Sequence, residues 1–556
     1  MTTTGSQGTA TRSGSRYLTL TAMLFAVAMT FIDQTIVAIA APQIQGELGL
    51  SSDGVQWIIN GYLLSLAAFF ALGGRLSDML GHKAVALTGV VIFAASSALC
   101  GLTPATSYAE PWIITFRVVQ GAGAALMFPA ALAIVVAAFP PRQRGSALAI
   151  FFAVSGGLTA IGPLAGGYLT QWTWRAIFWV NIPVAIVAVV LTLLATISTD
   201  RRRAPIDWLG ALLIAAGMAL SVLGFQQSNS WGWSSAWTWL CIVGGLLLLV
   251  AFVGYELRAA HPLIQVRIFA DRAFSVDNGV LFFAMMAFVP VFFFISLYSQ
   301  ISLGYSATNT GLFMLWFFLG FAVASQIGGH ILDRFGARWT VTVGTLVGAA
   351  GFALWAWKCT DLNATAQVPY IVTAGAGIGL LLGPASTDAV NRAIDASYGE
   401  VTGVTQTIRN YGSAVGLAVL GTLLLHVVDD RVVASLTALG VPAGQAQQAV
   451  AGYGAGTTGG TDLSALPAGQ RQAFASALQQ DFAQAVQVVF YGMALALVVA
   501  FVVSLWHPGG VYVDPNAPVT DSAPATGRAD VVRRLLVKVG IGAAIFVVVY
   551  FIFDLL

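Results

Sequence analysis

The chain has 556 residues, of which 58% are hydrophobic and only 9% are charged, and its mean hydropathy is +0.82. A soluble domain carries about 25% charged residues, so this composition excludes a soluble globular protein and predicts a polytopic protein of the lipid bilayer. The net charge of +2 gives no indication of a nucleic-acid partner, and the three scattered cysteines, without CxxC spacing, exclude a disulfide framework and a zinc knuckle.

Apolar segments of membrane-spanning length begin after a short polar arm. Residues 1–16 are rich in Ser, Thr and Gly, and we expect them to form a disordered cytoplasmic arm. A helix that crosses a bilayer needs about 20 apolar residues. The first apolar segment is too long for the core of a signal peptide, so it counts as a span. The region 17–198 predicts a six-helix bundle with spans at about 17–41, 54–74, 84–104, 112–138, 146–170 and 176–198.

Eight further spans follow a basic break at 200–203. The region 199–272 predicts two inserted helices with cytoplasmic linkers, and 273–506 predicts a second six-helix bundle with a long extracytoplasmic loop at 428–484. Residues 507–556 form a cytoplasmic tail, whose final apolar run 539–556 is either an interfacial helix or, as we favour, an extra span. The eight spans are about 208–226, 237–257, 275–299, 307–331, 339–358, 368–390, 401–427 and 485–506.

Basic residues are distributed unevenly between the two ends of these spans. With the N-terminus in the cytoplasm, most of the 25 lysines and arginines fall at cytoplasmic helix ends or in the tails. Cytoplasmic loops of membrane proteins carry such an excess of basic residues. The sequence therefore predicts a cytoplasmic N-terminus.

A ten-residue pattern occurs twice, after the second span of each bundle. Segments 74–83 and 329–338 carry Gly, Asp, Gly and a base at the same offsets, and Pro129 and Pro384 keep the same separation. Such a repeat predicts two halves of like fold. An ordinary tight loop would explain one copy but explains two poorly. We expect cytoplasmic gating loops that part and re-form, built on Gly74, Asp78, Gly81, Lys83, Gly329, Asp333, Arg334, Gly336 and Arg338.

Two charged residues lie within the spans of the first half. A carboxylate inside a span costs roughly 2.5–3.5 kcal/mol on insertion scales, so Asp33 is a functional candidate that can hold a proton or a cation. At ~1.5 Å per residue, Arg117 lies about 8 Å and Asp33 about 12 Å from the outer end, depths that allow contact. We expect the pair to couple proton binding to transport. The alternatives are a purely structural carboxylate and an arginine that snorkels to the headgroups.

The fifth span carries a run of glycines with one proline, namely Gly157, Gly162, Pro163, Gly166 and Gly167. Proline bends a helix, and glycines let a second helix approach closely. This pattern predicts a bent, closely packed seam that acts as a hinge and seals one side against proton leak.

Three further charged residues are secondary candidates for the transport pathway. Asp388 and Asp277 lie near cytoplasmic span ends, where an acid is more often solvated or caps a helix. Arg409 lies about eight residues into its span, and we interpret it as an internal pairing residue. The sequence contains no metal-ligand cluster, no nucleophile–base arrangement and no nucleotide-binding loop, so we expect neither an enzyme nor an ATP-driven pump.

Taken together, residues 17–506 resemble the fourteen-helix drug:proton antiporters of the major facilitator superfamily. The repeated loop and the fifth-span glycines belong to the resemblance, although Met79 stands where the family usually has a base. The other motifs that carry it are Asp33-x-Thr35-Ile36-Val37, Arg117 with Gln120-Gly121, Trp174-Arg175 with Asn181-Ile182-Pro183, Asp207-Trp208-x-Gly210, His261-Pro262-Leu263 before Phe269, and Gln300 with Gly304-Tyr305-Ser306.

The resemblance implies an all-α major-facilitator fold and alternating access without a cofactor. Asp33 and Arg117 would serve the proton-coupled step, and the proton gradient would drive export through a bacterial-type inner membrane by a monomer. We expect small-molecule substrates that are amphipathic or cationic, as in multidrug efflux. A dedicated exporter of one metabolite, siderophore or lipid shares every motif and is the alternative. A non-transporting receptor is a third hypothesis, which predicts that Asp33→Asn leaves function intact.

Overall fold

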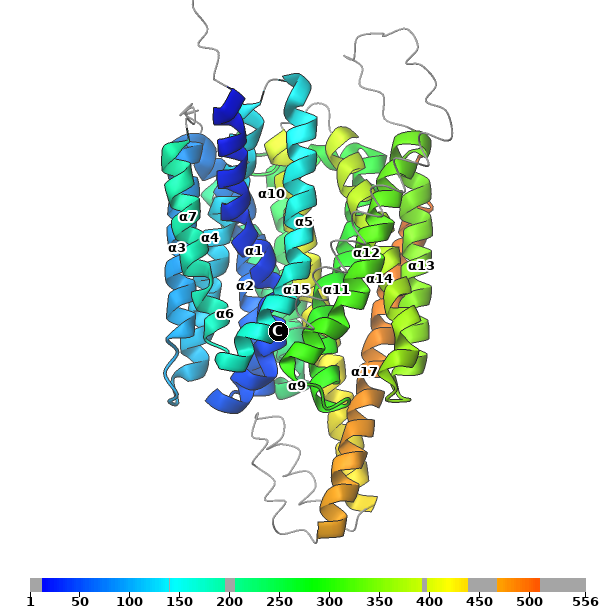
Figure 1. Cartoon of the computed structure of the whole chain (residues 1–556). Coiled ribbons are helices and arrows are strands. Elements are labelled where there is room, and N and C mark those ends of the chain that lie inside the picture. The colour runs from blue at the N-terminus through cyan, green and yellow to red at the C-terminus, as the bar shows by residue number, and fades with distance from the viewer. Residues whose placement is uncertain (1–12, 140, 196–205, 393–397, 439–467, 511–556) are drawn as a thin grey trace, which may run out of the picture.

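The structure is a computed structural model that describes residues 13–139, 141–195, 206–392, 398–438 and 468–510. In its first half the second and third helices flank the predicted gating loop, and a long fifth helix is followed by a broken sixth segment (Figure 1). The helices of this half are α1 (Ser13–Leu48), α2 (Ser52–Leu80), α3 (His82–Gly101), α4 (Ala109–Ala138), α5 (Pro141–Trp172), α6 (Ala176–Trp179) and α7 (Asn181–Leu194).

Two long helices separated by one turn of helix follow, namely α8 (Trp208–Gln226), α9 (Ser228–Trp231) and α10 (Ala236–Glu256). A 3₁₀ turn, η1 (Val266–Ala270), leads into the second half. That half contains α11 (Arg272–Ile301), α12 (Ala307–Phe335), α13 (Ala337–Cys359), α14 (Ala364–Arg392), α15 (Tyr398–Ala438) and α17 (Ala468–Ser504).

All regular structure in the described ranges is helical, and thirteen segments are long and apolar enough to cross a membrane. The 32-residue α5 lies alongside α1 and α12 and adds a further membrane-length helix. In a bilayer every backbone polar group must find a partner within the protein, which helices achieve internally. The predicted all-α polytopic fold, with six helices, two inserted helices and six helices, is confirmed.

The helical bundle has an upper and a lower end in Figure 1. The upper end carries the start of α1 and the end of α17, and the lower end carries the end of α1 and the start of α12. Both predicted gating loops lie at the upper end. Each turns at a glycine with positive φ, Gly81 at 98° and Gly336 at 79°, a conformation that glycine adopts without steric cost.

Several predicted boundaries differ from the structure. The described residues at both ends of the loop expected at 428–484 are helical, because α15 continues to Ala438 and α17 begins at Ala468. At 1.5 Å per residue these helices are about 60 and 55 Å long, roughly twice the thickness of a bilayer core, and Figure 1 shows both extending beyond the lower end. Polar Ala- and Gln-rich sequence forms helix readily, which hydropathy alone does not reveal.

Smaller differences occur at the two chain ends and in the sixth span. The first helix begins at Ser13, within the expected polar arm, and the sixth span is interrupted at Val180, between α6 and α7. The basic break at 200–203 and the apolar run 539–556 lie outside the described residues.

The two halves pack in the same way. In the first half α5 lies on α1, where a Cβ on Gly166 would stand 3.1 Å from the Ile36 carbonyl oxygen. In the second half α15 lies on α11, where a Cβ on Gly416 would collide with the carbonyl oxygen of Met286. Small residues thus let equivalent helix pairs approach closely, as is common in membranes.

The inserted helix α8 bridges the two halves from one side. It packs against α2 of the first half and α15 of the second. The Ser221 hydroxyl lies 2.7 Å from the Tyr411 hydroxyl, and Thr422 donates a hydrogen bond of 2.8 Å to the carbonyl oxygen of Phe225. The two six-helix bundles also contact each other directly, through α2 and α15.

Candidate functional site

A buried ion pair joins α1 to α4 in the interior of the first half. The Arg117 Nη1 atom donates to Asp33 Oδ2 at 2.5 Å, and each residue is only 1% exposed. The two residues lie 84 positions apart in the sequence, and the helices bring them together at the depths that their spacing predicts. Charges removed from water in this way are stabilised only where a partner compensates them.

Gln120, one turn after Arg117 on α4, completes this pair. Its amide nitrogen donates to Asp33 Oδ1 at 3.0 Å, and its amide oxygen accepts from Arg117 Nη1 at 2.8 Å. Both oxygens of the carboxylate are therefore hydrogen-bonded, one by a cation and one by a neutral amide. The spacing of three residues on a helix places Gln120 on the same face as Arg117.

The guanidinium is also held by α2, independently of Asp33. Arg117 Nε donates to the carbonyl oxygen of Ile58 at 2.7 Å, and its Cζ atom lies 4.5 Å from the centre of the buried Tyr62 ring. The Tyr62 hydroxyl in turn lies 3.4 Å from the carbonyl oxygen of Thr30. Arg117 therefore has contacts on α2 that do not depend on the charge of Asp33, because an aromatic face attracts a cation.

The glycine seam of α5 lies directly beside Asp33. A Cβ on Gly162 would stand 2.9 Å from the carbonyl oxygen of Ile32, the residue before Asp33. Thr35 Oγ1 donates to the carbonyl oxygen of Thr159 at 3.0 Å, which ties α1 to α5 one turn further. The α5 helix is therefore in direct contact with the part of α1 that carries the carboxylate. Gly157 lies in a stretch of α5 whose side-chain environment is outside the described part.

The other side of the same seam joins the two halves at the lower end. A Cβ on Gly311 of α12 would stand 2.5 Å from the carbonyl oxygen of Pro163, and one on Gly167 would stand 2.8 Å from the carbonyl oxygen of Ala307. Nearby, Gln300 of α11 donates to the carbonyl oxygen of Ile39 at 3.2 Å. These contacts close the lower end of the bundle between its halves.

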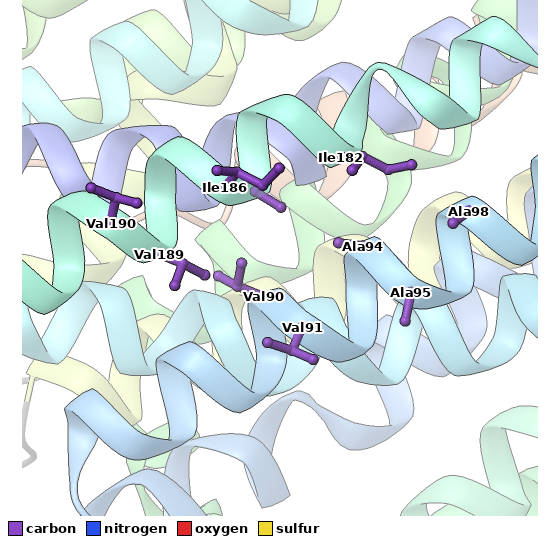
Figure 2. A pocket seen from close by; sticks show the side chains of 10 residues that line it. Val90, Val91, Ala94, Ala95, Ala98, Ile182, Ile186, Val189 and Val190 are labelled. Carbon is purple, nitrogen blue, oxygen red and sulfur yellow. The ribbon is translucent and has the colours of Figure 1, made fainter.

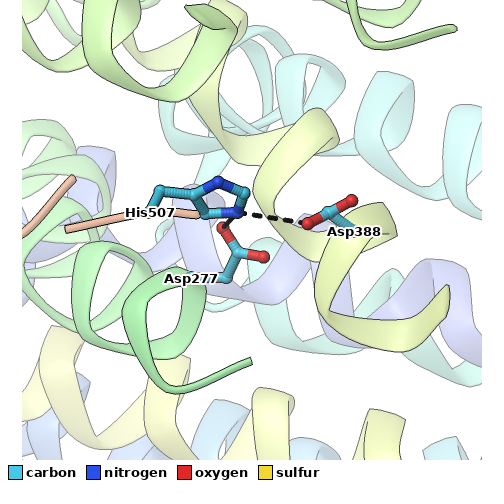
Figure 3. A group of neighbouring side chains, drawn as sticks. All are labelled: Asp277, Asp388 and His507. Atoms are coloured by element: carbon cyan, nitrogen blue, oxygen red, sulfur yellow. Dashed lines mark hydrogen bonds and ion pairs between the residues drawn. The ribbon is translucent and has the colours of Figure 1, made fainter. Parts of the chain in front are cut away.

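A second ionisable cluster lies near the upper end of the second half (Figure 3). His507 Nε2 is 3.2 Å from Asp388 Oδ2 and 3.5 Å from Asp277 Oδ1. All three residues are at most 2% exposed. The expectation that Asp277 and Asp388 are solvated or cap a helix is wrong for both residues; the α11 cap is Asp271, which accepts from the backbone N–H of Phe274 at 2.7 Å.

Burial disfavours the charged imidazole of His507, but the two neighbouring carboxylates outweigh this effect and raise the pKa of His507 to about 9. Neither oxygen of Asp277 makes a hydrogen bond within the described chain. Donor types alone would suit a divalent metal ion, since the three ligand atoms lie within 4.8 Å of one another.

The remaining candidates are not part of either cluster. Arg409 lies on α15, and its buried Nε atom has no hydrogen-bond partner in the described part of the chain. Among the gating-loop residues, Lys83 Nζ donates to the carbonyl oxygen of Ala195 at 3.2 Å, a contact within the first half. The side chain of Asp333 is outside the described part, so the expected latch between the halves stays a prediction.

An apolar groove runs between α3 and α7 on the outer surface of the first half (Figure 2). Its lining is entirely aliphatic, and Val91 and Ile186 on its rim are more than half exposed. Exposed aliphatic side chains on a membrane helix face lipid. The groove therefore belongs to the lipid-facing perimeter rather than to a polar site.

Sequence reasoning identified the ion pair but missed some of its supports. Gln120 appeared only as part of a motif, Tyr62 did not appear, and His507 was assigned to the tail. The signal for Gln120 is its i+3 spacing from a charged residue within a span. No local sequence pattern predicts the contacts of Tyr62 or His507, because their partners lie on other helices.

An all-helical bundle of two like halves with a buried ion pair inside one half defines a membrane transporter. The family model of the Major Facilitator Superfamily matches residues 23–417. The chain belongs to the major facilitator superfamily, and it is an integral membrane transporter rather than an enzyme.

Relatives and solved structures agree with this assignment. The chain is 33% identical to the tetracenomycin C resistance and export protein of Streptomyces glaucescens, over 75% of this chain and 77% of that protein. It is 34% identical to the cephamycin export protein CmcT of Amycolatopsis lactamdurans, over 72% and 84%. It is 31% identical to the multidrug resistance protein Stp of Mycobacterium tuberculosis (strain CDC 1551 / Oshkosh), over 74% and 76%.

Among solved structures, a bacterial homologue of the human lysosomal transporter Spinster in an inward-facing and unoccupied conformation is similar, with a TM-score of 0.58. That likeness covers 89% of this chain and 98% of the other at 18% identity, and it concerns the fold alone.

Proposed function

We propose that the protein is a proton-coupled secondary exporter of amphipathic or cationic small molecules, working by alternating access without a cofactor. The observation that carries the proposal is the buried pair of Asp33 and Arg117. An ionisable pair in the interior of a membrane bundle is costly, and its usual role is to bind protons or ions. Relatives named for antibiotic export and multidrug resistance support the direction of transport.

Protonation of Asp33 is the coupling step in this mechanism. A proton on the carboxylate removes its charge and weakens the bond to Arg117, which stays in place through Ile58 and Tyr62. Breaking a buried pair by charging or discharging one partner changes the free energy by roughly 3–5 kcal/mol, enough to bias two conformations. The free energy of the proton gradient is thereby converted into movement of α1 relative to α4.

Alternating access follows from the seam of α5. Gly162 contacts α1 beside Asp33, while Pro163 and Gly167 contact α12 at the lower end. A change in the position of α1 is therefore passed to the contact between the halves. The excess of basic residues at the upper end supports an upper end in the cytoplasm, so that a closed lower end corresponds to a transporter open toward the cytoplasm.

The remaining expectations belong to the same proposal. The protein functions as a monomer in a bacterial-type inner membrane, with its N-terminus in the cytoplasm, and exchanges protons for small-molecule substrates. The two gating loops at 74–83 and 329–338 meet when the cytoplasmic side closes. Asp388, Asp277 and Arg409 are secondary residues of the pathway, and nucleic acid is not a partner.

A second candidate is an exporter dedicated to one compound, such as a metabolite, a siderophore or a lipid. It is favoured by the two relatives that are named for a single antibiotic each, tetracenomycin C and cephamycin. A panel of unrelated compounds separates the two candidates, because a dedicated exporter responds to one chemical class.

The test uses purified protein in liposomes with an imposed pH gradient and a trapped pH dye. Lipophilic cations and neutral drugs are added to wild type, to Asp33→Asn and to a control, Asp361→Asn, whose carboxylate pairs with Lys358 at the exposed lower end. We expect several cations to collapse the gradient through wild type and the control but not through Asp33→Asn. If no compound moves protons through folded wild type, the broad-drug proposal is wrong.

A further inference from the structure

The cluster of Asp277, Asp388 and His507 is built from three distant parts of the chain. Asp277 comes from the first turns of α11, Asp388 from the last turns of α14, and His507 from the segment that follows α17 (Figure 3). Together they bring two carboxylates and one imidazole into a site where each residue is at most 2% exposed.

The charges of this cluster do not balance. With a neutral imidazole it carries two negative charges away from water, and Asp277 receives no hydrogen bond within the described chain. Like charges in such a site repel each other strongly, because little solvent screens them. The cluster is therefore built to receive one further positive charge, whereas the pair of Asp33 and Arg117 is already neutral.

The environment of the imidazole decides which cation fits. The backbone N–H of Gly509 donates to His507 Nδ1 at 3.0 Å, so this nitrogen carries no hydrogen and the ring hydrogen is on Nε2. A metal ion bound at Nε2 requires the opposite tautomer, with a hydrogen on Nδ1 that faces an acceptor. A bound proton also places a hydrogen on Nδ1, but it leaves the ring hydrogen on Nε2 between the two carboxylates, whereas a metal ion would displace that hydrogen as well. The site therefore favours a proton over a metal ion.

We propose that Asp277, Asp388 and His507 form a second proton-binding site, separate from Asp33, in which one proton taken from the upper face is held by the imidazole between the two carboxylates. Loading adds a hydrogen at Nδ1 and changes the charge of the cluster from −2 to −1. The geometry seen is the unloaded one, since Nδ1 still accepts from Gly509.

Loading has a mechanical consequence. A hydrogen on Nδ1 would point at the N–H of Gly509, so the turn at Gly509 and Gly510 must shift. Both glycines have positive φ, 77° and 87°, and a backbone of this kind rearranges at low cost. The turn lies against the side chain of Arg338, in the predicted gating loop after α12, where a Cβ on Gly509 would stand 3.4 Å from Arg338 Cδ. Proton binding is thus connected to the gating loop of the second half.

The groups that set the proton affinity of the site can be named. Asp277 faces His507 from α11 and Asp388 faces it from α14, and both favour the imidazolium. The Arg338 side chain lies against the adjoining turn from α13, and burial of the ring opposes the charged form. The carboxylates prevail, in line with the pKa of His507 of about 9. In such a coupled cluster an apparent pKa describes the whole set of groups rather than one residue.

The experiment measures the imidazole directly, in the full chain with ¹⁵N-labelled histidine in lipid bilayers, by solid-state NMR as a function of pH. The chain has five histidines, and the His507 signals are identified by their loss in His507→Gln. We expect His507 to titrate near 9, with a hydrogen on Nε2 alone above that pH, and to titrate closer to 6.5 in Asp277→Asn. Asp271→Asn, which keeps the cap of α11, is the matched control and leaves the titration unchanged.

Several outcomes would overturn the inference. These are a His507 titration near 6.5 in wild type, a titration that does not respond to Asp277→Asn, and ¹⁵N shifts of Nε2 that change on addition of micromolar Zn²⁺ or Mn²⁺ instead of with pH. If His507→Gln does not fold, the Asp277→Asn comparison still decides the question. The inference rests on the proposed function only in giving the proton a part in transport, and because the titration is read without transport, either can fail alone.

Discussion

The two halves of the molecule differ in how fully their buried charges are compensated. In the first half, a carboxylate, a guanidinium and an amide satisfy one another, with Arg117 and Gln120 occupying both oxygens of Asp33. In the second half, two carboxylates share one imidazole, and Asp277 has no hydrogen bond within the described chain. In the first site every buried charge has a partner before a proton binds, and a proton on Asp33 would weaken the ion pair. In the second site negative charge is in excess until a proton binds.

This difference shows how a repeated fold acquires unequal functions. Helix packing is the same in both halves, as the contacts of α5 on α1 and of α15 on α11 show. The side chains set on that scaffold differ, because the arginine of the first half has no counterpart 255 residues later, where the chain has Val372. The two halves therefore share their helix packing, whereas their buried ionisable side chains differ.

The largest expected effect comes from Arg117→Met, which leaves the buried Asp33 without its cation. Removing one partner of a buried pair costs roughly 3–5 kcal/mol, so we expect a large loss of thermal stability and no proton-coupled transport. The double variant Asp33→Asn with Arg117→Met removes both charges and should regain most of the stability but none of the coupling. Thermal unfolding in detergent checks both variants. Equal stability of the single and double variants would contradict the account of the pair.

An intermediate effect is expected from pH on the second cluster. The pKa of His507 is raised from 6.5 to about 9, so its contribution to stability is full below about pH 6.5 and is lost as the pH rises through 9. By linkage that contribution is at most ~3 kcal/mol. Thermal unfolding followed from pH 6 to 10 should therefore show a decline for wild type that is smaller for Asp277→Asn. Parallel curves for the two proteins would refute the proposed coupling.

The smallest effect is expected from Tyr62→Phe. This change keeps the ring under Arg117 and removes only a long hydrogen bond of 3.4 Å to Thr30. We expect a loss of stability below about 1 kcal/mol and transport within about twofold of wild type. Tyr62→Ala, which removes the ring, should weaken both properties clearly more. If Tyr62→Phe abolishes coupling, the hydroxyl takes part in proton transfer and the role assigned to the ring is wrong.

Much of the fold was readable from sequence, because twenty-residue apolar runs and a repeated loop carry a strong physical signal. The polar extensions of α15 and α17 could not be predicted, since hydropathy detects only the apolar part of a helix. Asp33 and Arg117 could be matched by depth, but the third and fourth contacts, from Gln120 and Tyr62, depend on how helices rotate against one another. The contacts of His507 with two carboxylates could not be predicted, because the segment after α17 comes to lie beside α11 and α14 only in the folded protein.

The central claim is that Asp33 couples protons to transport without being needed for substrate movement itself. The most direct measurement compares two modes in proteoliposomes, exchange of labelled for unlabelled substrate and accumulation driven by a pH gradient. We predict that Asp33→Asn still exchanges substrate, more slowly than wild type, and loses gradient-driven accumulation, because the neutral amide mimics the protonated carboxylate but cannot release a proton. Accumulation by Asp33→Asn at the wild-type level would contradict the account.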